Sequence, residues 1–449
     1  MITNRDIAKT FRLTAQLLEL HEENPFKIRS YSNAAFKIDK LSKPLHDCTS
    51  DEISGIDGIG KTISTCISEL FSTGKFNELT RVIEKTPVGV IEMLAIKGIG
   101  PKKIGVIWKN LNIESPGELL YACNENRLID LKGFGLKTQL QIKQAIEYKI
   151  SNSGKYHYAV AEAVASGLID FLKTSLGIEN VSLTGPVRRK CEVIECIDVL
   201  IVNPEVPDIS EFNDKYNPVA IPVNIILSQK EDFSLELFKT SGTSDHLKHI
   251  ENNSDWTHIL KETFLNEKDI YERAGFPYIV PELREGIFEF SWANSNKEED
   301  LISYLDLKGV LHVHTDYSDG IHSLEEMAVY CKNSGFEYIG ISDHSQSAFY
   351  ANGLKAEKVM AQHKEIDLLN EKLFPFKIFK GIESDILNTG ELDYPEEILK
   401  SFDFVVASVH SNLKMDEEKA TARLLKAIEN PYTTILGHMT GRLLLSRKG

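Results

Sequence analysis

The 449-residue sequence lacks the features that mark membrane and secreted proteins. It has no apolar run of about 18 residues, the length that a bilayer-spanning helix needs. Its first twenty residues show no basic, apolar and small-residue order, so we expect no signal peptide. The six cysteines form no Cys-x-x-Cys pair, which argues against a disulfide framework or a thiolate zinc site. We expect a cytoplasmic protein that has no membrane partner.

The charge is strongly uneven along the chain. The net charge is −15, yet residues 1–150 carry 21 Lys and Arg against 18 Asp and Glu, and the remainder carries 30 against 48. Acidity of the whole argues against nucleic-acid binding over the entire surface, but it leaves room for a local site near the N-terminus. The acidic remainder suits a domain that holds divalent cations. The length predicts about three domains or more.

Residues 1–150 read as helical throughout, with one pattern repeated three times. Each copy is a Gly-apolar-Gly turn followed by a basic residue and a helix, as in GIDGIGKTISTCISEL, AIKGIGPKKIGVIWKNL and DLKGFGLKTQLQIKQAI. Glycine lets the backbone turn tightly, and N–H groups at a helix start can bind a phosphate oxygen. A single copy would be read as a helix cap; three copies indicate DNA binding. The predicted contact residues are Gly58, Gly60, Lys61, Gly98, Gly100, Lys102, Lys103, Gly133, Gly135 and Lys137.

From about residue 155 the sequence pattern changes to short apolar runs rich in β-branched residues. This pattern predicts a mixed α/β region to about residue 240. From about residue 305, strands alternate with helices, which predicts a parallel sheet or barrel. In such folds functional residues lie at the C-terminal ends of the strands.

Every apolar run in this last region ends in a side chain that can bind a metal. Imidazole and carboxylate together suit zinc, manganese or iron, and a set of this size can hold two or three ions. Such ions polarise a phosphoryl oxygen and lower the pKa of water. The predicted ligands are His312, His314, Asp319, His344, Glu383, His410 and His438.

Other polar residues near this set have different interpretations. The period of two along a strand predicts that His312 and His314 share one face. Asp343, beside His344, is the expected partner that fixes an imidazole tautomer. His363, in a polar helix, and His322, in a turn, are interpreted as surface residues.

The motifs HVHTDYSDG, ISDHS, GIESDI, ASVHS and GHMTGR resemble the polymerase and histidinol phosphatase (PHP) family of phosphoesterases. This resemblance implies a distorted β/α barrel with up to three metal ions, and a phosphate contact at Arg442. Seven of the family's nine ligand positions match. The last two form an Asp-x-His pair beyond SRKG, so we expect an incomplete barrel and a fragment of a longer protein.

The N-terminal turns resemble helix-hairpin-helix motifs, and NPFKIRSYSNAAFKI resembles the start of family X DNA polymerases. That resemblance implies a multidomain α+β protein with a nucleotidyltransferase-like palm and thumb between the hairpins and the PHP domain. The implied domains are the N-terminal hairpin domain (1–85), a fingers-like helical domain (86–152), a palm (153–240), a thumb (241–303) and the PHP domain (304–449).

The palm that this resemblance implies is degenerate. LTGPVRRKCEVIECIDVLIV resembles the palm motif and retains Arg188 and Arg189 as nucleotide contacts. Of three expected carboxylates only Asp198 remains, because the other two positions hold Cys196 and Asn224. A thiol and an amide do not replace two carboxylates as magnesium ligands, so we do not expect magnesium at the palm.

A second catalytic position of the family also differs in this chain. The Lys that the family's lyase uses for a Schiff base falls on Cys66, which we interpret as a small buried residue.

The leading hypothesis is a DNA repair-type phosphoesterase, a 3′→5′ exonuclease or an end phosphatase, whose polymerase activity is lost. It would act as a monomer on gapped, nicked or single-stranded DNA ends. One alternative is an active gap-filling polymerase, and another is a DNA-binding scaffold in which both sites are inactive.

Overall fold

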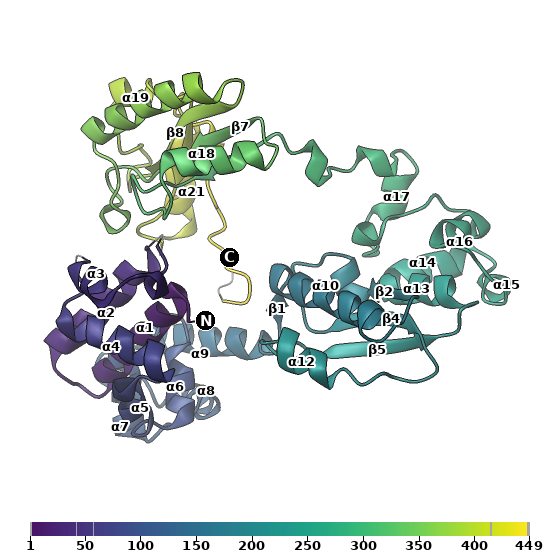
Figure 1. Ribbon diagram of the computed structural model, residues 1–449, viewed down its shortest axis with the longest axis horizontal. Coiled ribbons are helices and arrows are strands. Elements are labelled where there is room, and N and C mark those ends of the chain that lie inside the picture. The colour runs from purple at the N-terminus through teal and green to yellow at the C-terminus, as the bar shows by residue number, and fades with distance from the viewer. Residues whose placement is uncertain (1, 42, 57, 414, 447–449) are drawn as a thin grey trace. The chain divides into compact units, whose positions relative to one another are not determined.

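The computed structural model describes residues 2–41, 43–56, 58–413 and 415–446. Figure 1 shows the chain coloured along its length. The chain divides into two compact units. The first comprises Met1–Ile146 and Ser303–Arg442, and the second comprises Glu147–Ile302 and Leu443–Gly449. The predicted domain boundaries stay predictions. The predicted fold class is confirmed, with an all-α N-terminal region, a mixed α/β body and a C-terminal parallel sheet. No described helix has both the length and the hydrophobicity that crossing a bilayer requires.

The N-terminal region is built around helix α1, whose apolar residues recur at helical spacing. Ile7, Phe11 and Leu18 are fully buried in its core, and Thr3 and Asp6 form a reciprocal capping box at its start. The helices are α1 (Asn4–Leu20), α2 (Pro25–Asp39), η1 (Leu45–Asp47), α3 (Ser50–Gly55), α4 (Lys61–Thr73), α5 (Asn77–Ile83), α6 (Val88–Leu94), α7 (Pro101–Leu111), α8 (Pro116–Asn124) and α9 (Leu136–Ser151).

The three Gly-apolar-Gly turns share one backbone geometry. The first glycine of each is left-handed, with φ of 83° at Gly58, 91° at Gly98 and 89° at Gly133, a conformation that side chains with a Cβ rarely adopt. The apolar residue between the glycines is buried in each copy, and the helix that follows starts directly after the second glycine. The repeats are therefore one structural unit used three times.

The middle segment contains two small sheets and a helical second half. Strand β4 pairs with β2 antiparallel and with β5 parallel. The elements are β1 (Tyr156–His157), α10 (Tyr158–Thr174), β2 (Val181–Thr184), α11 (Gly185–Arg188), β3 (Val193–Ile194), β4 (Ile197–Val202), α12 (Ser210–Tyr216), β5 (Val223–Ser228), α13 (Phe233–Ser241), α14 (Ser244–Asn253), α15 (Trp256–Ile259), α16 (Glu267–Ala274), η2 (Pro281–Leu283) and α17 (Glu289–Ala293).

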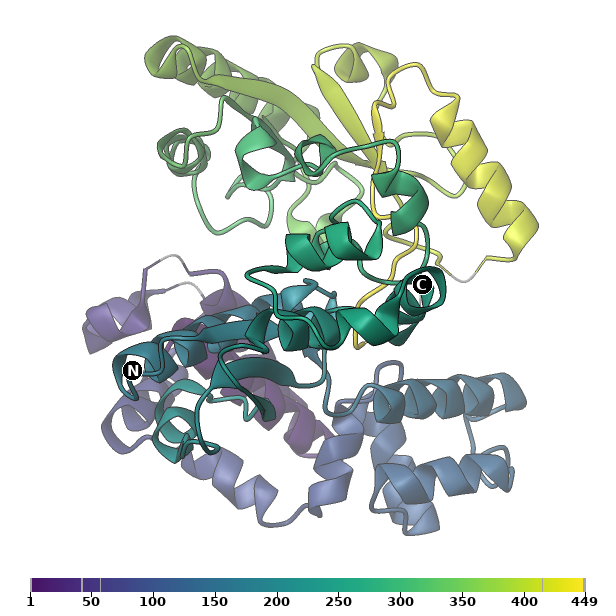
Figure 2. The same ribbon diagram turned by 90° about the vertical axis from the view of Figure 1, so that its right-hand side faces the viewer.

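The C-terminal segment is a five-stranded sheet in the order β10-β9-β8-β7-β6, with every neighbouring pair parallel. It forms a half-barrel, with helices packed around it (Figures 1 and 2). Its elements, with two preceding turns, are η3 (Glu298–Asp300), η4 (Tyr304–Asp306), β6 (Gly309–Val313), α18 (Leu324–Asn333), β7 (Tyr338–Ile341), η5 (Phe349–Ala351), α19 (Ala356–Leu373), β8 (Lys377–Asp385), α20 (Glu396–Leu399), β9 (Phe404–Ser408), α21 (Glu417–Ile428) and β10 (Ile435–Leu436).

A buried ion cluster joins the two halves of the middle segment. Arg284 is fully buried, and its Nη1 lies 2.5 Å from Oε1 of Glu267. Arg188 binds the same carboxylate through both terminal nitrogens, at 3.0 and 2.5 Å. Burial alone would raise the pKa of Glu267, but the two guanidinium groups outweigh it and hold that pKa below its ordinary value. Each charge depends on its partners, because an unpaired buried ion is very costly.

Replacing Glu267 by Gln is expected to lower the free energy of unfolding by about 3–5 kcal/mol at neutral pH, because two buried guanidinium groups lose their counter-charge. The carboxylate of Glu267 stabilises the fold above the pKa of the unfolded chain, about 4.3, and that contribution is lost as the pH falls through the lower folded pKa. Urea unfolding followed by tryptophan fluorescence measures this, since Trp256 and Trp292 pack in the same core.

The control is Glu211→Gln, which removes an exposed carboxylate paired with Lys215. It should leave the urea midpoint at its wild-type value. A Glu267→Gln protein as stable as the wild type, or one with an unchanged pH dependence between pH 3 and 6, would contradict the role of this cluster.

Candidate metal centre

The seven predicted metal ligands come from five neighbouring strands and the loops that follow them. Because the strands are parallel, their C-terminal ends lie along one edge of the sheet. His312 lies in β6, Glu383 lies in β8, and the other five follow the ends of strands β6, β7, β9 and β10. The structure brings all seven together in the contacts described next.

Glu383 is the residue around which the imidazoles gather. Its side chain is 1% exposed. Three imidazole Nε2 atoms face its Oε1, at 2.9 Å from His312, 3.0 Å from His438 and 3.2 Å from His410. One buried carboxylate oxygen is thus shared by the ends of β6, β9 and β10.

The other oxygen of Glu383 faces two further imidazoles. His344 Nδ1 lies 3.0 Å from Oε2 and His314 Nε2 lies 3.5 Å from it. The opposite nitrogens of these two rings face Asp319 Oδ1, at 3.7 Å from His344 and 3.3 Å from His314. Asp319 and Glu383 therefore enclose both rings between two carboxylates.

Strand β6 reaches this position through a backbone irregularity. The pairing of β6 with β7 shifts register between Val310 and Val313, and His312 has a φ of 60°. A β-bulge re-aims side chains, and a left-handed non-glycine residue stores strain that clusters at functional sites. His312 and His314 both face Glu383. They reach it through this irregular backbone and not through the simple alternation of side chains along a regular strand.

The donor set fits divalent metal ions. Three compact groups of possible ligand atoms occur here: His312, His314 and Glu383; His314, Asp319 and His344; and His344, Glu383 and His410. His314, His344 and His410 each present both ring nitrogens to carboxylates, although a neutral imidazole has one N–H. In the described part of the chain, Nδ1 of His314 and of His344 is buried near a carboxylate oxygen, but neither contact has the geometry of a hydrogen bond. Cations between these rings and carboxylates would bind the ring nitrogens that carry no hydrogen and would also balance the carboxylate charge.

The buried charges of the site shift the pKa values of their neighbours. Burial would raise the pKa of Glu383, but hydrogen bonds from His312 and His410 hold it well below its ordinary range. Burial opposes protonation of His410, yet its contacts with Asp385 and Glu383 raise its pKa to about 9. Burial lowers the pKa of His344.

Asp385 is a member of the site that the sequence analysis missed. Its Oδ1 lies 2.6 Å from Nδ1 of His410, which leaves Nε2 directed at Glu383. A carboxylate in this place fixes the orientation of a metal-binding imidazole. The signal was available, because Asp385 follows Glu383 by two residues in β8 and so lies on the same face.

We expected Asp343 to orient His344, and this expectation is wrong. It is fully buried, and it accepts hydrogen bonds from the backbone and hydroxyl of Thr315, both at 2.7 Å. It also accepts from Ser318 at 2.5 Å and from Gln362 at 2.6 Å. Its carboxylate thus anchors the loop between His314 and Asp319, because that loop offers more donors than the neighbouring ring.

Two more buried charged residues hold the other strand-end loops. Asp393 accepts hydrogen bonds from the hydroxyls of Ser345 and Ser384, which follow His344 and Glu383 directly in the sequence. Arg423, in α21, donates to the carbonyls of Ile386, Leu387 and Ser411. It therefore ties the loop after β8 to the loop after β9.

The remaining predictions in this region have separate outcomes. His363 is 5% exposed and packs edge-on against Phe402, so its surface interpretation is wrong; α19 turns this face of its helix toward the sheet. His322 is exposed, as expected. The Arg442 side chain is exposed and its backbone N–H donates to the hydroxyl of Thr440. Its role as a phosphate contact stays a prediction.

The predicted DNA-binding residues lie at the hairpin turns. A Cβ added at Gly60, Gly100 or Gly135 would meet no atom within 4 Å, so the backbone there is open to an approaching phosphate. Lys61 and Lys137 are exposed at the starts of their helices. DNA contacts at these positions stay predictions.

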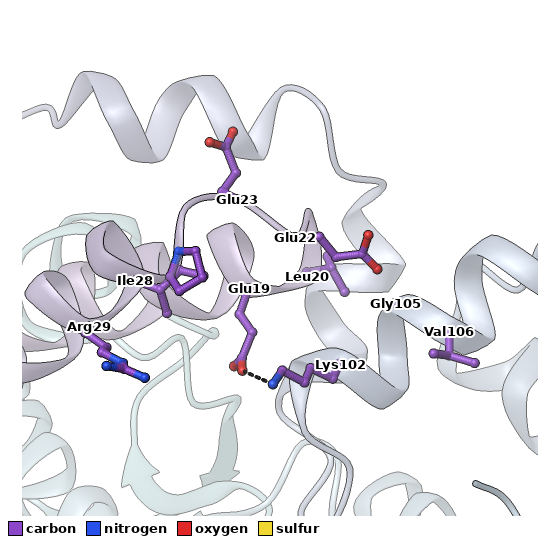
Figure 3. A pocket seen from close by; sticks show the side chains of 10 residues that line it. Glu19, Leu20, Glu22, Glu23, Ile28, Arg29, Lys102, Gly105 and Val106 are labelled. Carbon is purple, nitrogen blue, oxygen red and sulfur yellow. Dashed lines mark ion pairs between the residues drawn. The ribbon is translucent and has the colours of Figure 1, made fainter. Parts of the chain in front are cut away.

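Carboxylates at the end of α1 lie near the second hairpin. Lys102 lies 3.9 Å from Glu19, and both line a cavity of about 540 Å³ together with Glu22 and Glu23 (Figure 3). Lys103 lies over the ring of Phe134. The carboxylates here reduce the positive potential that Lys102 contributes.

The palm-like strands place Asp198 and Asn224 as direct partners on β4 and β5. The amide of Asn224 donates to Asp198 Oδ1 at 2.9 Å. Burial, together with the charge of Asp198, raises the pKa of the Cys196 thiol. Glu195, next to Cys196, is exposed and lies 3.4 Å from Lys155.

The two arginines predicted to contact nucleotide are engaged by carboxylates. Arg188 binds Glu267, as described above, and the Nε of Arg189 lies 2.7 Å from Glu285.

Cys66, in α4, is half-buried. Its sulfur lies 3.9 Å from the hydroxyl of Tyr31, and burial raises the pKa of its thiol. Cys66 is therefore less buried than the sequence suggested.

Comparisons with known proteins agree with this architecture. Family models match a helix-hairpin-helix domain at residues 2–76, a SAM-like helix-hairpin-helix tandem at 90–147 and a PHP domain at 311–444. The chain is 31% identical to the "DNA polymerase/3′-5′ exonuclease PolX" of Bacillus subtilis, over 99% of this chain and 83% of that protein.

Two shorter similarities are confined to about a third of the chain. A probable phosphatase of Caldanaerobacter subterraneus is 32% identical over 30% of this chain and 53% of its own length. A probable phosphatase of Acetivibrio thermocellus is 30% identical over 28% and 52%, respectively. The Bacillus relative matches 99% of this chain, and the two hairpin regions and the PHP domain occur in the same order as in that family. The chain therefore belongs to the family X DNA polymerases that carry a PHP domain.

Proposed function

We propose that this chain is a DNA-end-processing phosphoesterase whose polymerase activity has been lost. Its hairpins hold DNA, and the PHP site hydrolyses phosphodiesters as a 3′→5′ exonuclease or removes phosphate from DNA ends. The observation that carries this proposal is the convergence of five imidazoles on the buried carboxylate of Glu383. The printed name of the Bacillus relative, which includes a 3′-5′ exonuclease, supports the same direction.

The proposed cofactors are two or three divalent ions, manganese, zinc or iron, held by the seven ligand residues. When bound, such ions polarise a phosphoryl oxygen and lower the pKa of water. Glu383 supplies negative charge at the centre of the imidazoles, and Asp385 keeps the ring of His410 aimed at that centre. Asp343 and Arg423 hold the strand-end loops so that the ligands need not reorganise on binding. Arg442 is the proposed phosphate contact.

Loss of polymerase activity is supported by the partners of Asp198. Phosphoryl transfer at a palm requires carboxylates that face magnesium ions. Here the Asn224 amide donates to Asp198, and a donor in this position opposes cation binding. A Cys196 thiol with a raised pKa stays protonated at neutral pH, so it supplies no charge. Arg189 would also have to leave Glu285 to reach a nucleotide.

Replacing His344 by Ala is expected to reduce DNA hydrolysis about 100-fold or more, because the loss of a residue that merely supports a ligand already costs roughly 10- to 100-fold. The assay follows a 5′-labelled single strand with manganese. A ladder of shortened products identifies a 3′→5′ exonuclease, and release of phosphate from a 3′-phosphorylated strand identifies an end phosphatase.

Two controls accompany this assay. His258→Ala, an exposed histidine of the middle segment, should keep full activity. Binding of gapped DNA by the His344→Ala protein, measured by gel shift, should equal that of the wild type. The proposal fails if the metal-loaded wild type leaves single-stranded and gapped DNA intact while it cleaves a phosphoester that is not DNA.

Primer extension on gapped DNA, with magnesium or manganese, tests the loss of polymerase activity. We expect no incorporation above background by the wild type, and therefore no change in Asp198→Ala. Incorporation by the wild type that disappears in Asp198→Ala would establish the alternative of an active gap-filling polymerase. Incorporation that survives this substitution would show that the palm alignment itself is wrong.

A further inference from the structure

Two adjacent aromatic side chains are exposed in the loop that follows His344, and one of them contacts metal-binding residues. Phe349 and Tyr350, in the turn η5 between β7 and α19, are 86% and 61% exposed. The ring of Tyr350 lies edge-on to His344, with centroids 5.9 Å apart, and to His410, with centroids 6.3 Å apart. Large exposed apolar groups at the edge of a charged site commonly indicate a binding surface.

The loop that carries these rings is held firmly. The carbonyls of Ser345 and Ala348 accept hydrogen bonds from the N–H groups of Ala348 and Ala351, both at 3.0 Å. Gly353 N–H donates to the carbonyl of Ala348 at 3.1 Å, and a Cβ at Gly353 would lie 1.9 Å from the carbonyl oxygen of Ser345. Ser347 N–H donates to Asp393 at 2.8 Å.

Exposed aromatic rings on a backbone that is already held in place bind a flat ligand at a reduced entropic cost. Binding such a ligand does not require the loop to be fixed first, so most of the stacking energy is retained. Nucleobases stack on aromatic side chains irrespective of sequence, because every base has a π-face. Small sugar phosphates have no such face and would leave both rings exposed to water.

We propose that Phe349 and Tyr350 form a stacking platform for a base at the DNA end that is being hydrolysed. This inference rests on the proposed function, because the phosphodiester next to that base would occupy the metal centre. It narrows the substrate class to strand ends that have an unpaired base, and it assigns Phe349 and Tyr350 to base recognition and the seven ligands to the phosphate.

The test compares two single strands that differ only in the 3′-terminal residue, an ordinary nucleotide or a tetrahydrofuran abasic residue. The wild type should show a KM about 5- to 150-fold lower for the strand with the base, the range that one stacked base provides. In the double variant Phe349→Ala, Tyr350→Ala this preference should vanish, because the KM for the strand with the base rises to that for the abasic strand.

Matched variants separate stacking from other effects. Phe349→Tyr with Tyr350→Phe keeps both rings and should keep the preference. Tyr330→Ala removes an exposed ring from α18, in the last turn before the chain enters β7 at the opposite end from the ligands, and should have no effect. A double alanine variant that retains the preference, or one that loses kcat and metal instead, would overturn the proposal.

A binding measurement keeps this proposal separate from the proposed function. A strand with 2-aminopurine at its 3′ end should lose fluorescence on binding the wild type, because the base stacks, and lose much less with the double alanine variant. If the wild type cleaves neither strand but quenches in this way, the platform stands and the hydrolytic proposal fails. Equal quenching by both proteins overturns the platform, whatever the activity.

Discussion

The structure of the C-terminal segment depends on one buried carboxylate. Glu383 is almost inaccessible to water, and five imidazole nitrogens lie 2.9–3.5 Å from its two oxygens. A buried charge of this kind is stable only when it is paired. The imidazoles come from both sides of β8, so the parallel sheet and the order of its strands are what make the cluster possible. The same cluster leaves ring nitrogens between carboxylates, which is the arrangement that divalent ions satisfy.

The precision of the site comes from charged residues that are not ligands. Asp343, Asp393 and Arg423 are buried, and each binds hydroxyl groups or backbone atoms in the loops at the ends of the strands. Buried hydrogen bonds therefore contribute to the conformation of these loops. The aromatic pair at Phe349 and Tyr350 is held in the same way, through Asp393. One set of buried polar anchors therefore positions both the ligands and the proposed base platform.

Much of this arrangement could be predicted from the sequence, because strand periodicity and Gly-apolar-Gly spacing are local signals. The alternating strands and helices are confirmed, and all three turns have a left-handed first glycine. The bulge at His312 was not predictable, because it arises from pairing with β7. His363 was misjudged because a polar helix sequence does not show which face packs on the sheet. Asp343 was given the wrong partner because adjacency in sequence is not adjacency in space.

In the palm-like strands, Cys196 and Asn224 stand where the family resemblance implies carboxylates, whereas the seven predicted metal ligands of the PHP domain lie in contact. The proposed hydrolysis belongs to the second site, and it requires ions held by Glu383. The most direct measurement is the metal content of the dialysed full-length protein, by inductively coupled plasma mass spectrometry, for the wild type and for Glu383→Gln. If Glu383 holds the ions, we expect two or three manganese, zinc or iron ions per wild-type chain and the loss of most of them in the variant. Fewer than one ion in the wild type, or equal content in both proteins, would contradict it.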